Sequence, residues 1–176
     1  MTASYQNDKI QLFTKRTNML PEEITSFIGK TGNVRTLEVE KGAIRKFADA
    51  MEDQNLLYWD EAYSQNSKYG NIIAPPGFFG WPDKWVKAGP LFSELLMELR
   101  AALFKLGYSH DLDGSIEYEF FNPILAGDTL KADSVIKNIK ERKSGNEKTT
   151  FAVMEITYTN QNGEMVAKTR QTLVYQ

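Results

Sequence analysis

The sequence predicts an α+β domain in which a curved antiparallel sheet wraps around one long central helix. Residues 91–107 place leucines and alanines on a single stripe at helical spacing. Residues 114–176 alternate apolar and polar side chains, as half-buried strands do. Within them, the Asn162-Gly163 pair is the strongest short-range signal of a hairpin. A long helix followed by an antiparallel meander is typical of α+β domains, because the sheet must bury its apolar face against another element.

The length and composition indicate one globular unit. The chain has 176 residues, of which 41% are hydrophobic and 25% charged, values that are usual for globular domains. We expect a single domain over residues 19–176, preceded by a flexible polar arm at residues 1–18. The arm lacks the apolar block of a signal peptide, and no apolar run is long enough to span a bilayer. We therefore expect a soluble, cytoplasmic protein that has no membrane partner.

The residue counts argue against several classes of function. A net charge of −2 gives no overall basic field to attract nucleic acid. The absence of cysteine removes disulfides, thiolate nucleophiles and cysteine-based metal sites. His110 is the only histidine; a surface loop is its expected place, and no metal site can be built on it alone. We expect no metal, no cofactor and no nucleic-acid partner.

The first half of the domain predicts two helices separated by a strand. Residues 21–29 begin with a proline, which a first helical turn tolerates. Residues 34–40 alternate as a strand. Residues 42–53 predict a helix with one apolar face at i, i+3, i+4 and i+7 spacing, formed by Ile44, Phe47, Ala48 and Met51. Residues 59–70 predict a loop or a frayed helix that contains several aromatic side chains.

A longer helical region comes next. It starts after Pro76, is interrupted at residues 88–90, and resumes at residues 91–107, where Gly107 closes it. The apolar stripe of this last helix consists of Leu91, Leu95, Leu99, Ala102, Leu103 and Leu106. Such a stripe requires an apolar surface beside it, which a sheet would provide.

The remaining residues predict an antiparallel meander of at least four strands. These strands are expected at residues 114–121, 128–143, 149–160 and 164–176. In the first of them, the alternation places Ile116, Tyr118 and Phe120 on one face and Glu117 and Glu119 on the other. The turns between the last three strands fall at residues 144–147 and at Asn162-Gly163.

Four segments in order resemble a known family. They are VEKGAIRKFADAMEDQNLLYWDEAY, KYGNIIAPPGF, EYEFFNPILAGDTLKADSVI and FAVMEITYTNQNGEMVAKT. The chain resembles the MaoC-like branch of the hotdog superfamily, the (R)-specific enoyl-CoA hydratases and 3-hydroxyacyl dehydratases, and most closely their N-terminal-type domain. The resemblance covers roughly residues 34–172. It implies a hotdog fold and a dimer that binds an acyl thioester, attached to CoA or to an acyl carrier protein.

The resemblance also implies where the catalytic residues lie. In the family pattern D-x-N-P-x-H, the Asp and the His position and activate the attacking water. Here Asp53 and Asn55 match, Leu56 replaces the proline, and Tyr58 occupies the position of the histidine. A phenol with a pKa near 10 is a poor base at neutral pH, whereas an imidazole with a pKa near 6.5 suits the task. Tyr58 retains the ability to hydrogen-bond a water or to donate a proton.

A second departure concerns the donor to the thioester carbonyl. The family's A-H-G segment offers a backbone N–H, but the gapless match here is Ala74-Pro75-Pro76, and proline has no N–H. We expect Gly77 to take over this role from a helix start, where free donors favour negative charge. Phe78 and Trp81, beside Pro76 and Gly77, are expected to shape the substrate pocket.

Each of these residues also has a purely structural interpretation. Without the resemblance, Asp53 is a turn residue after a helix, Tyr58 is a packed aromatic, and Asn55 holds its loop by side chain-to-backbone bonds. The segment around Gly77 is a turn that leads into a helix.

The sequence supports three functions. The first is a hydratase or dehydratase of enoyl and 3-hydroxyacyl thioesters, with Asp53 and Tyr58 as catalytic residues and with Asn55, Pro76, Gly77, Phe78 and Trp81 binding substrate. The degenerate motif favours one half of a heterodimer of two hotdog subunits, with a homodimer as the alternative. The second function is an acyl-CoA thioesterase, which would release free CoA. The third is a non-catalytic subunit that binds an acyl thioester.

Overall fold

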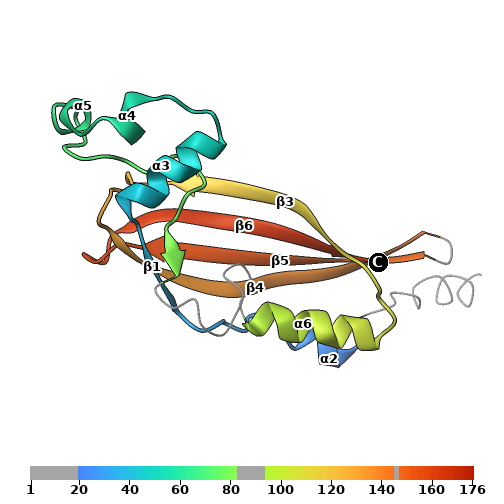
Figure 1. Cartoon of the computed structure of the whole chain (residues 1–176). Coiled ribbons are helices and arrows are strands. Elements are labelled where there is room, and N and C mark those ends of the chain that lie inside the picture. Colours follow the sequence, from blue (N-terminus) through green and yellow to red (C-terminus); the bar gives the residue numbers. More distant parts are fainter. Residues whose placement is uncertain (1–19, 83–93, 145–146) are drawn as a thin grey trace, which may run out of the picture.

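The computed structural model describes residues 20–82, 94–144 and 147–176 (Figure 1). The expected arm at residues 1–18 lies outside the described residues, as do most of the helical region expected after Pro76 and the beginning of the helix at 91–107. Side chains in the short strand at Trp81–Pro82 are likewise outside the description. What remains includes all of the predicted meander except the tip of one hairpin.

Six strands form one antiparallel sheet in the order β2-β1-β4-β5-β6-β3. Their bounds are β1 Arg35–Glu38, β2 Trp81–Pro82, β3 Asp111–Phe120, β4 Thr129–Ser144, β5 Glu147–Thr159 and β6 Met165–Tyr175. Strands β4, β5 and β6 follow one another as a meander, which confirms the prediction for these three strands; the expected fourth member, β3, does not pair with β4. β3 precedes the meander in the chain and lies beside β6 at an edge of the sheet (Figure 1).

The long helix α6, Glu94–Lys105, packs against one face of this sheet together with the short helix α2, Glu22–Thr25 (Figure 1). Four of the predicted stripe residues of α6 are buried, and Leu96 is buried with them: Leu95, Leu96, Leu99, Ala102 and Leu103. They meet apolar side chains of β4, β5 and β6. Burial of a leucine side chain stabilises a fold by about 1.5–3 kcal/mol, so this contact holds the helix on the sheet.

A second group of helices packs at the other end of the sheet (Figure 1). It contains α3, Lys41–Ala50, α4, Leu56–Trp59, and α5, Glu61–Gln65. The predicted apolar face of α3 is buried at Ile44 and Ala48, whereas Met51 is 65% exposed. The buried residues join a core cluster that includes side chains from β1, β4, β5 and β6. The domain therefore has one apolar cluster under α6 and another under the segment that carries the candidate site.

The helix expected directly after Pro76 is not present where the structure describes that segment. Residues 75–78 form a turn, and the chain then enters β2, which pairs with β1 through Leu37 with Pro82 and Glu38 with Trp81. Gly80 lies between them with a φ of +84°, and a Cβ there would come within 2.5 Å of the Glu38 carbonyl oxygen. This close approach leaves no room for a side chain at position 80, so a glycine is required for the segment to lie this close to β1.

The face of β3 that carries Ile116, Tyr118 and Phe120 alternates as predicted, but it is not buried. All three side chains are between 44% and 48% exposed. The cause is the edge position of β3, which pairs with β6 alone among the described strands.

None of the helices in residues 20–82, 94–144 and 147–176 has the length and hydrophobicity that a bilayer crossing requires.

Candidate functional site

The candidate site begins where α3 ends. Glu52 adopts a φ of 55°, the only positive value at a non-glycine residue of the described chain. The reversal lets the Asp53 N–H donate to the Ala48 carbonyl at 2.9 Å, a bond that closes a helix C-terminus. Asp53 thus leaves the helix in a fixed direction. Its side chain is exposed in the isolated chain.

Asp53 and Asn55 are held by a short local network. The Asp53 Oδ1 atom accepts from the Asn55 N–H at 3.0 Å, and the Asp53 carbonyl oxygen accepts from the indole N–H of Trp59 at 2.8 Å. Asn55 caps α4, since its Oδ1 atom accepts from the Leu57 N–H at 3.1 Å. The structure therefore gives Asn55 the loop-holding role. Its expected contact with substrate stays a prediction.

Tyr58 points inward from α4 and is 6% exposed. Burial raises the pKa of the Tyr58 hydroxyl above its usual value, and the negative charge of Asp53 raises it further, while a hydrogen bond with the Asn55 side chain opposes both. Each of the two raising effects favours the neutral phenol. Tyr58 is thus held protonated beside Asp53, so it can donate a hydrogen bond but cannot act as a base at neutral pH.

The turn at residues 75–78 lies alongside this loop. The Ile73 N–H donates to the Leu57 carbonyl at 3.2 Å, which ties the strand-like segment before the turn to α4. Tyr58 and Phe78 share one buried cluster. Pro76 is exposed, and the backbone of Trp81 lies in β2. The structure therefore brings Asp53, Asn55 and Tyr58 together, with Phe78 packed in the layer next to them.

Gly77 sits at the third position of the turn. The Phe78 N–H donates to the Pro75 carbonyl at 3.0 Å, and Gly77 has a φ of +93°. Proline at the second position and a positive φ at the third are the features of a type II turn. The N–H of Gly77 belongs to the central peptide of the turn, which the closing hydrogen bond does not use. The expectation of a helix start at Gly77 is wrong, because this N–H comes from a turn instead; among the described residues it has no acceptor, and in this sense it is free.

Aromatic side chains surround this turn. A Cβ on Gly77 would lie 3.9 Å from both the Phe47 ring and the Tyr118 hydroxyl. Phe78 packs on Phe47 with ring centroids 5.4 Å apart. Phe79 stacks on Tyr158, Tyr118 and Phe120 at 4.2, 5.9 and 6.2 Å. The expected role of Phe78 as a pocket wall stays a prediction.

Sequence reasoning missed Tyr118 and Tyr158 as neighbours of the site. The alternation placed Tyr118 on the apolar face of its strand, but nothing in the linear sequence indicates that β3 and β5 lie beside residues 77–79. The pKa of Tyr158 is raised, mainly by burial. Both phenols therefore add a hydroxyl group to an otherwise apolar group of rings.

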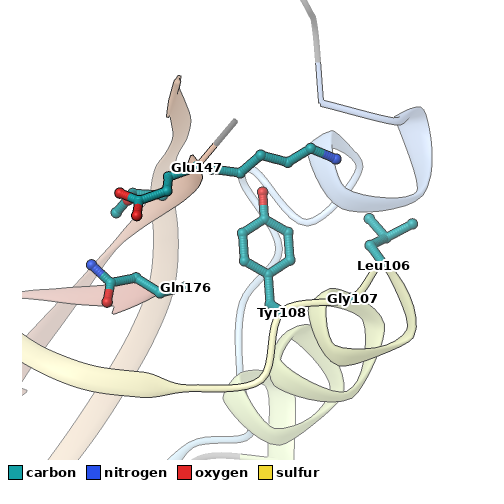
Figure 2. Close-up of a pocket in the computed structure, with 7 residues that line it drawn as sticks. Leu106, Gly107, Tyr108, Glu147 and Gln176 are labelled. Carbon is teal, nitrogen blue, oxygen red and sulfur yellow. The ribbon is translucent and has the colours of Figure 1, made fainter. Parts of the chain in front are cut away.

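Two hollows in the described surface lie apart from these residues. The first, of about 440 Å³, is bounded by the end of α6 and the start of β5 (Figure 2). The hydroxyl of Tyr108 in its wall is already bonded to Glu141 at 2.9 Å and Thr150 at 2.7 Å. The second, of about 570 Å³, lies where β1 meets α3. Neither contains Asp53 or Tyr58, and the described residues hold no cluster of His, Cys, Asp or Glu suited to a metal ion.

Comparison with known proteins identifies the family. The family described as FAS1-like, dehydratase domain region, matches residues 26–169. The chain belongs to this dehydratase family. Among its relatives, a UPF0336 protein of Saccharopolyspora erythraea is 30% identical over 157 residues, covering 85% of this chain and 88% of the relative. A probable enoyl-CoA hydratase alpha subunit of Thermomonospora curvata is 27% identical over 139 residues, covering 74% of this chain and 43% of the relative.

Several solved structures share the fold. The ChsH1-ChsH2 complex of Mycobacterium tuberculosis contains a chain that matches with a TM-score of 0.71 at 16% identity, covering 87% of this chain and 88% of that one. A MaoC-like dehydratase matches with a TM-score of 0.62 at 22% identity, covering 86% of this chain and 43% of that one. The α+β hotdog fold and the MaoC-like hydratase and dehydratase family, both expected from the sequence, are confirmed.

Proposed function

We propose that this chain acts in the reversible hydration of enoyl-CoA thioesters as one half of a two-subunit hotdog hydratase, whose other half supplies the general base. One observation carries the proposal. Tyr58 is buried and held protonated at the position where the family pattern has a histidine, while Asp53 beside it keeps its carboxylate toward solvent. The relative named as an enoyl-CoA hydratase alpha subunit supports the reaction, and the two-protein complex that shares the fold supports the pairing.

The described residues can perform part of the reaction. Hydration adds the oxygen of water to the β-carbon of the enoyl thioester and a proton to the α-carbon. The Asp53 carboxylate can accept a hydrogen bond from the attacking water and orient it, and the free N–H of Gly77 can donate to the thioester oxygen as negative charge develops there. The proton that leaves the water needs a base near neutral pH, which the protonated Tyr58 is not.

The rate contributions of these groups explain why a partner is needed. An oxyanion donor lowers the reaction barrier by about 3–4 kcal/mol, and a positioned acid or base raises the rate roughly 100- to 10,000-fold. A chain without its histidine should therefore be slower by orders of magnitude than a complete subunit. A partner that brings an intact D-x-N-P-x-H motif to the same acyl site would restore the missing factor.

The exposure of Asp53 favours one competing function, a subunit that binds the acyl thioester without chemistry. In that case Asp53 is a surface turn residue that reaches no substrate. Replacing it would leave the rate of any assembled complex unchanged, which separates the two functions.

The test measures hydration of crotonyl-CoA and of a bulkier enoyl-CoA by the chain alone and by its complex with a hotdog chain that retains D-x-N-P-x-H. We expect turnover only in the complex, and Asp53→Asn should lower it by roughly 100-fold or more. Asp49→Asn changes an exposed carboxylate on α3, the helix that precedes Asp53; it is the matched control and should leave the rate unchanged.

Two results would contradict the proposal. Strong turnover by the chain alone, abolished by Asp53→Ala, would refute the need for a partner's base. An Asp53→Asn complex with the full rate would favour the non-catalytic subunit. Release of free CoA is followed in the same assay, because thioester hydrolysis releases CoA and hydration does not.

A further inference from the structure

The free edge of the sheet is lined by large apolar side chains. Strand β3 hydrogen-bonds to β6 on one side and to no described strand on the other. Side chains at this edge are between 44% and 56% exposed: Leu112, Ile116, Tyr118, Phe120 and Phe121. A long edge strand with exposed apolar residues invites pairing with another chain.

The opposite face of the sheet carries a ladder of ion pairs that ends at this edge. Lys137 of β4 pairs with Glu155 of β5 at 3.3 Å, and Glu155 pairs with Arg170 of β6 at 3.3 Å. Arg170 then pairs with Glu117 of β3 at 3.5 Å. The charge therefore alternates from strand to strand as positive, negative, positive, negative.

A second pair of opposite charges lies beside the ladder at the same edge. Glu119 of β3 lies directly opposite Lys168 of β6, although the next position on β5 is the neutral Thr157. The Glu117 side chain, at the end of the ladder, is 69% exposed. At the open edge, each of these two carboxylates therefore has a cation on one side only.

We propose that β3 pairs with the edge strand of a different hotdog subunit, one that carries Lys or Arg opposite Glu117 and Glu119. This proposal rests on the two-subunit hydratase above and adds the chemistry that selects the partner. Opposite charges on facing strands stabilise a sheet, and like charges directly opposite destabilise it. A basic partner strand would extend the ladder by one cation beside Glu117 and would give Glu119 a second cation.

Pairing of β3 with its own copy works against this pattern. The strand contains Asp111, Asp113, Glu117 and Glu119, and it has no Lys, Arg or His. An antiparallel pair centred on Tyr118 places Glu117 of each copy opposite Glu119 of the other. Every other register also lacks an opposite-charge pair between the two strands, because neither strand has a cation. The edge thus selects against a homodimer.

The same interface reaches the candidate site. Tyr118 faces away from the ladder, and its hydroxyl is among the atoms closest to Gly77. A partner strand hydrogen-bonded to β3 would run beside Tyr118 and Phe120 and cover their exposed rings. It would place partner side chains near the N–H of Gly77, on the acyl site to which the partner's base must be brought.

The first experiment uses the unmodified chain in sedimentation velocity at several salt concentrations. The Debye length falls from about 30 Å at 0.01 M to about 3 Å at 1 M salt. If glutamates oppose self-pairing, the chain is monomeric at low salt, and any dimer becomes stronger as salt rises. A dimer that is tight at low salt and weakens with added salt would overturn the proposal.

The second experiment uses Glu117→Lys/Glu119→Lys as a stand-in for a basic partner. Mixed with the unmodified chain at low salt, it should form a heterodimer at least about tenfold tighter than either chain's self-pair, by native mass spectrometry of chains with different tags. The heterodimer should weaken as salt rises, opposite to the self-pair. Glu98→Lys/Asp133→Lys, which reverses two exposed carboxylates away from the edge, is the control and should form no heterodimer. Circular dichroism verifies that each variant is folded.

Equal affinity of the mixed and self pairs would overturn the charge selection even if a complex hydrates crotonyl-CoA. Conversely, charge-selected pairing without hydration by any complex would leave the interface in place and refute the proposed reaction. The two failures are therefore distinguishable.

Discussion

Tyr58 is the residue whose chemistry differs most from that of a complete hydratase. Its hydroxyl is buried beside Asp53, and burial and the neighbouring charge both raise its pKa. The same surroundings would affect an imidazole differently, because burial disfavours the charged imidazolium while Asp53 favours it. These opposing effects leave a histidine at this position able to titrate near neutral pH.

We predict that Tyr58→His gives the isolated chain measurable hydration of crotonyl-CoA. Because the neutral imidazole is the base, the rate should be low in acid and rise as the pH passes through a value within about one unit of 6.5. Tyr58→Phe is the control: it removes the hydroxyl but adds no base, so it should remain inactive at every pH. A Tyr58→His rate that equals the Tyr58→Phe rate would show that residue 58 does not face the acyl site.

The two halves of the candidate site were unequally predictable from the sequence. Asp53, Asn55 and Tyr58 lie within six residues, and the bonds that hold them are local, so a sequence pattern contains them. The neighbourhood of Gly77 depends on β3 reaching the turn at residues 75–78 across the fold. No local pattern carries that information, and Tyr118 was therefore missed.

At the scale of the elements, the end of α3 stores backbone strain next to Asp53. Glu52 takes the left-handed conformation that glycine usually supplies after a helix. For a residue with a Cβ, this conformation costs roughly 1 kcal/mol of conformational free energy. The backbone bond from the Asp53 N–H to Ala48 depends on it.

We predict that Glu52→Gly raises the free energy of unfolding by up to about 1 kcal/mol, because glycine adopts the positive φ without strain. Glu52→Val should lower it by about 1 kcal/mol or more, since a β-branched side chain fits this conformation poorly. Urea denaturation of both variants measures the difference. If the Glu52→Gly variant were less stable than the Glu52→Val variant, the positive φ at Glu52 would not be strained.

Periodicity predicted α3, α6 and the meander because their core-facing residues recur at fixed spacing along each element. It failed after Pro76, where a helical pattern was expected and the structure has a turn and β2. There the close approach of Gly80 to the Glu38 carbonyl, a contact between distant residues, decides the conformation. Long-range pairing of this kind outweighs local preference.

At the scale of the whole molecule, the sheet connects two apolar clusters, one under α6 and the other under the site. Tyr175, near the C-terminal end of β6, belongs to the cluster under α6 and is 1% exposed. Burial, together with the negative charge of Asp111, raises the pKa of its hydroxyl to about 12, although Arg100 opposes the shift. Ionisation of this one phenol would therefore place a charge inside the core that holds the central helix.

The raised pKa of Tyr175 determines how the free energy of unfolding changes with pH. The unfolded chain has a tyrosine pKa near 10, so the neutral phenol favours the folded state, and this contribution is complete below about pH 10. It is lost as the pH rises from about 10 toward 12, a change of roughly 3 kcal/mol over two pKa units.

We predict that Tyr175→Phe, which cannot ionise, loses less stability than the unmodified chain between about pH 9 and about pH 11, each about one unit from the usual tyrosine pKa. Urea denaturation at the two pH values measures the difference. Tyr63→Phe, at a side chain that is 51% exposed, is the control and should follow the unmodified chain. Parallel curves for Tyr175→Phe and the unmodified chain would mean that the phenol is already hydrated in the folded protein, and that the cluster under α6 opens to water at the end of β6.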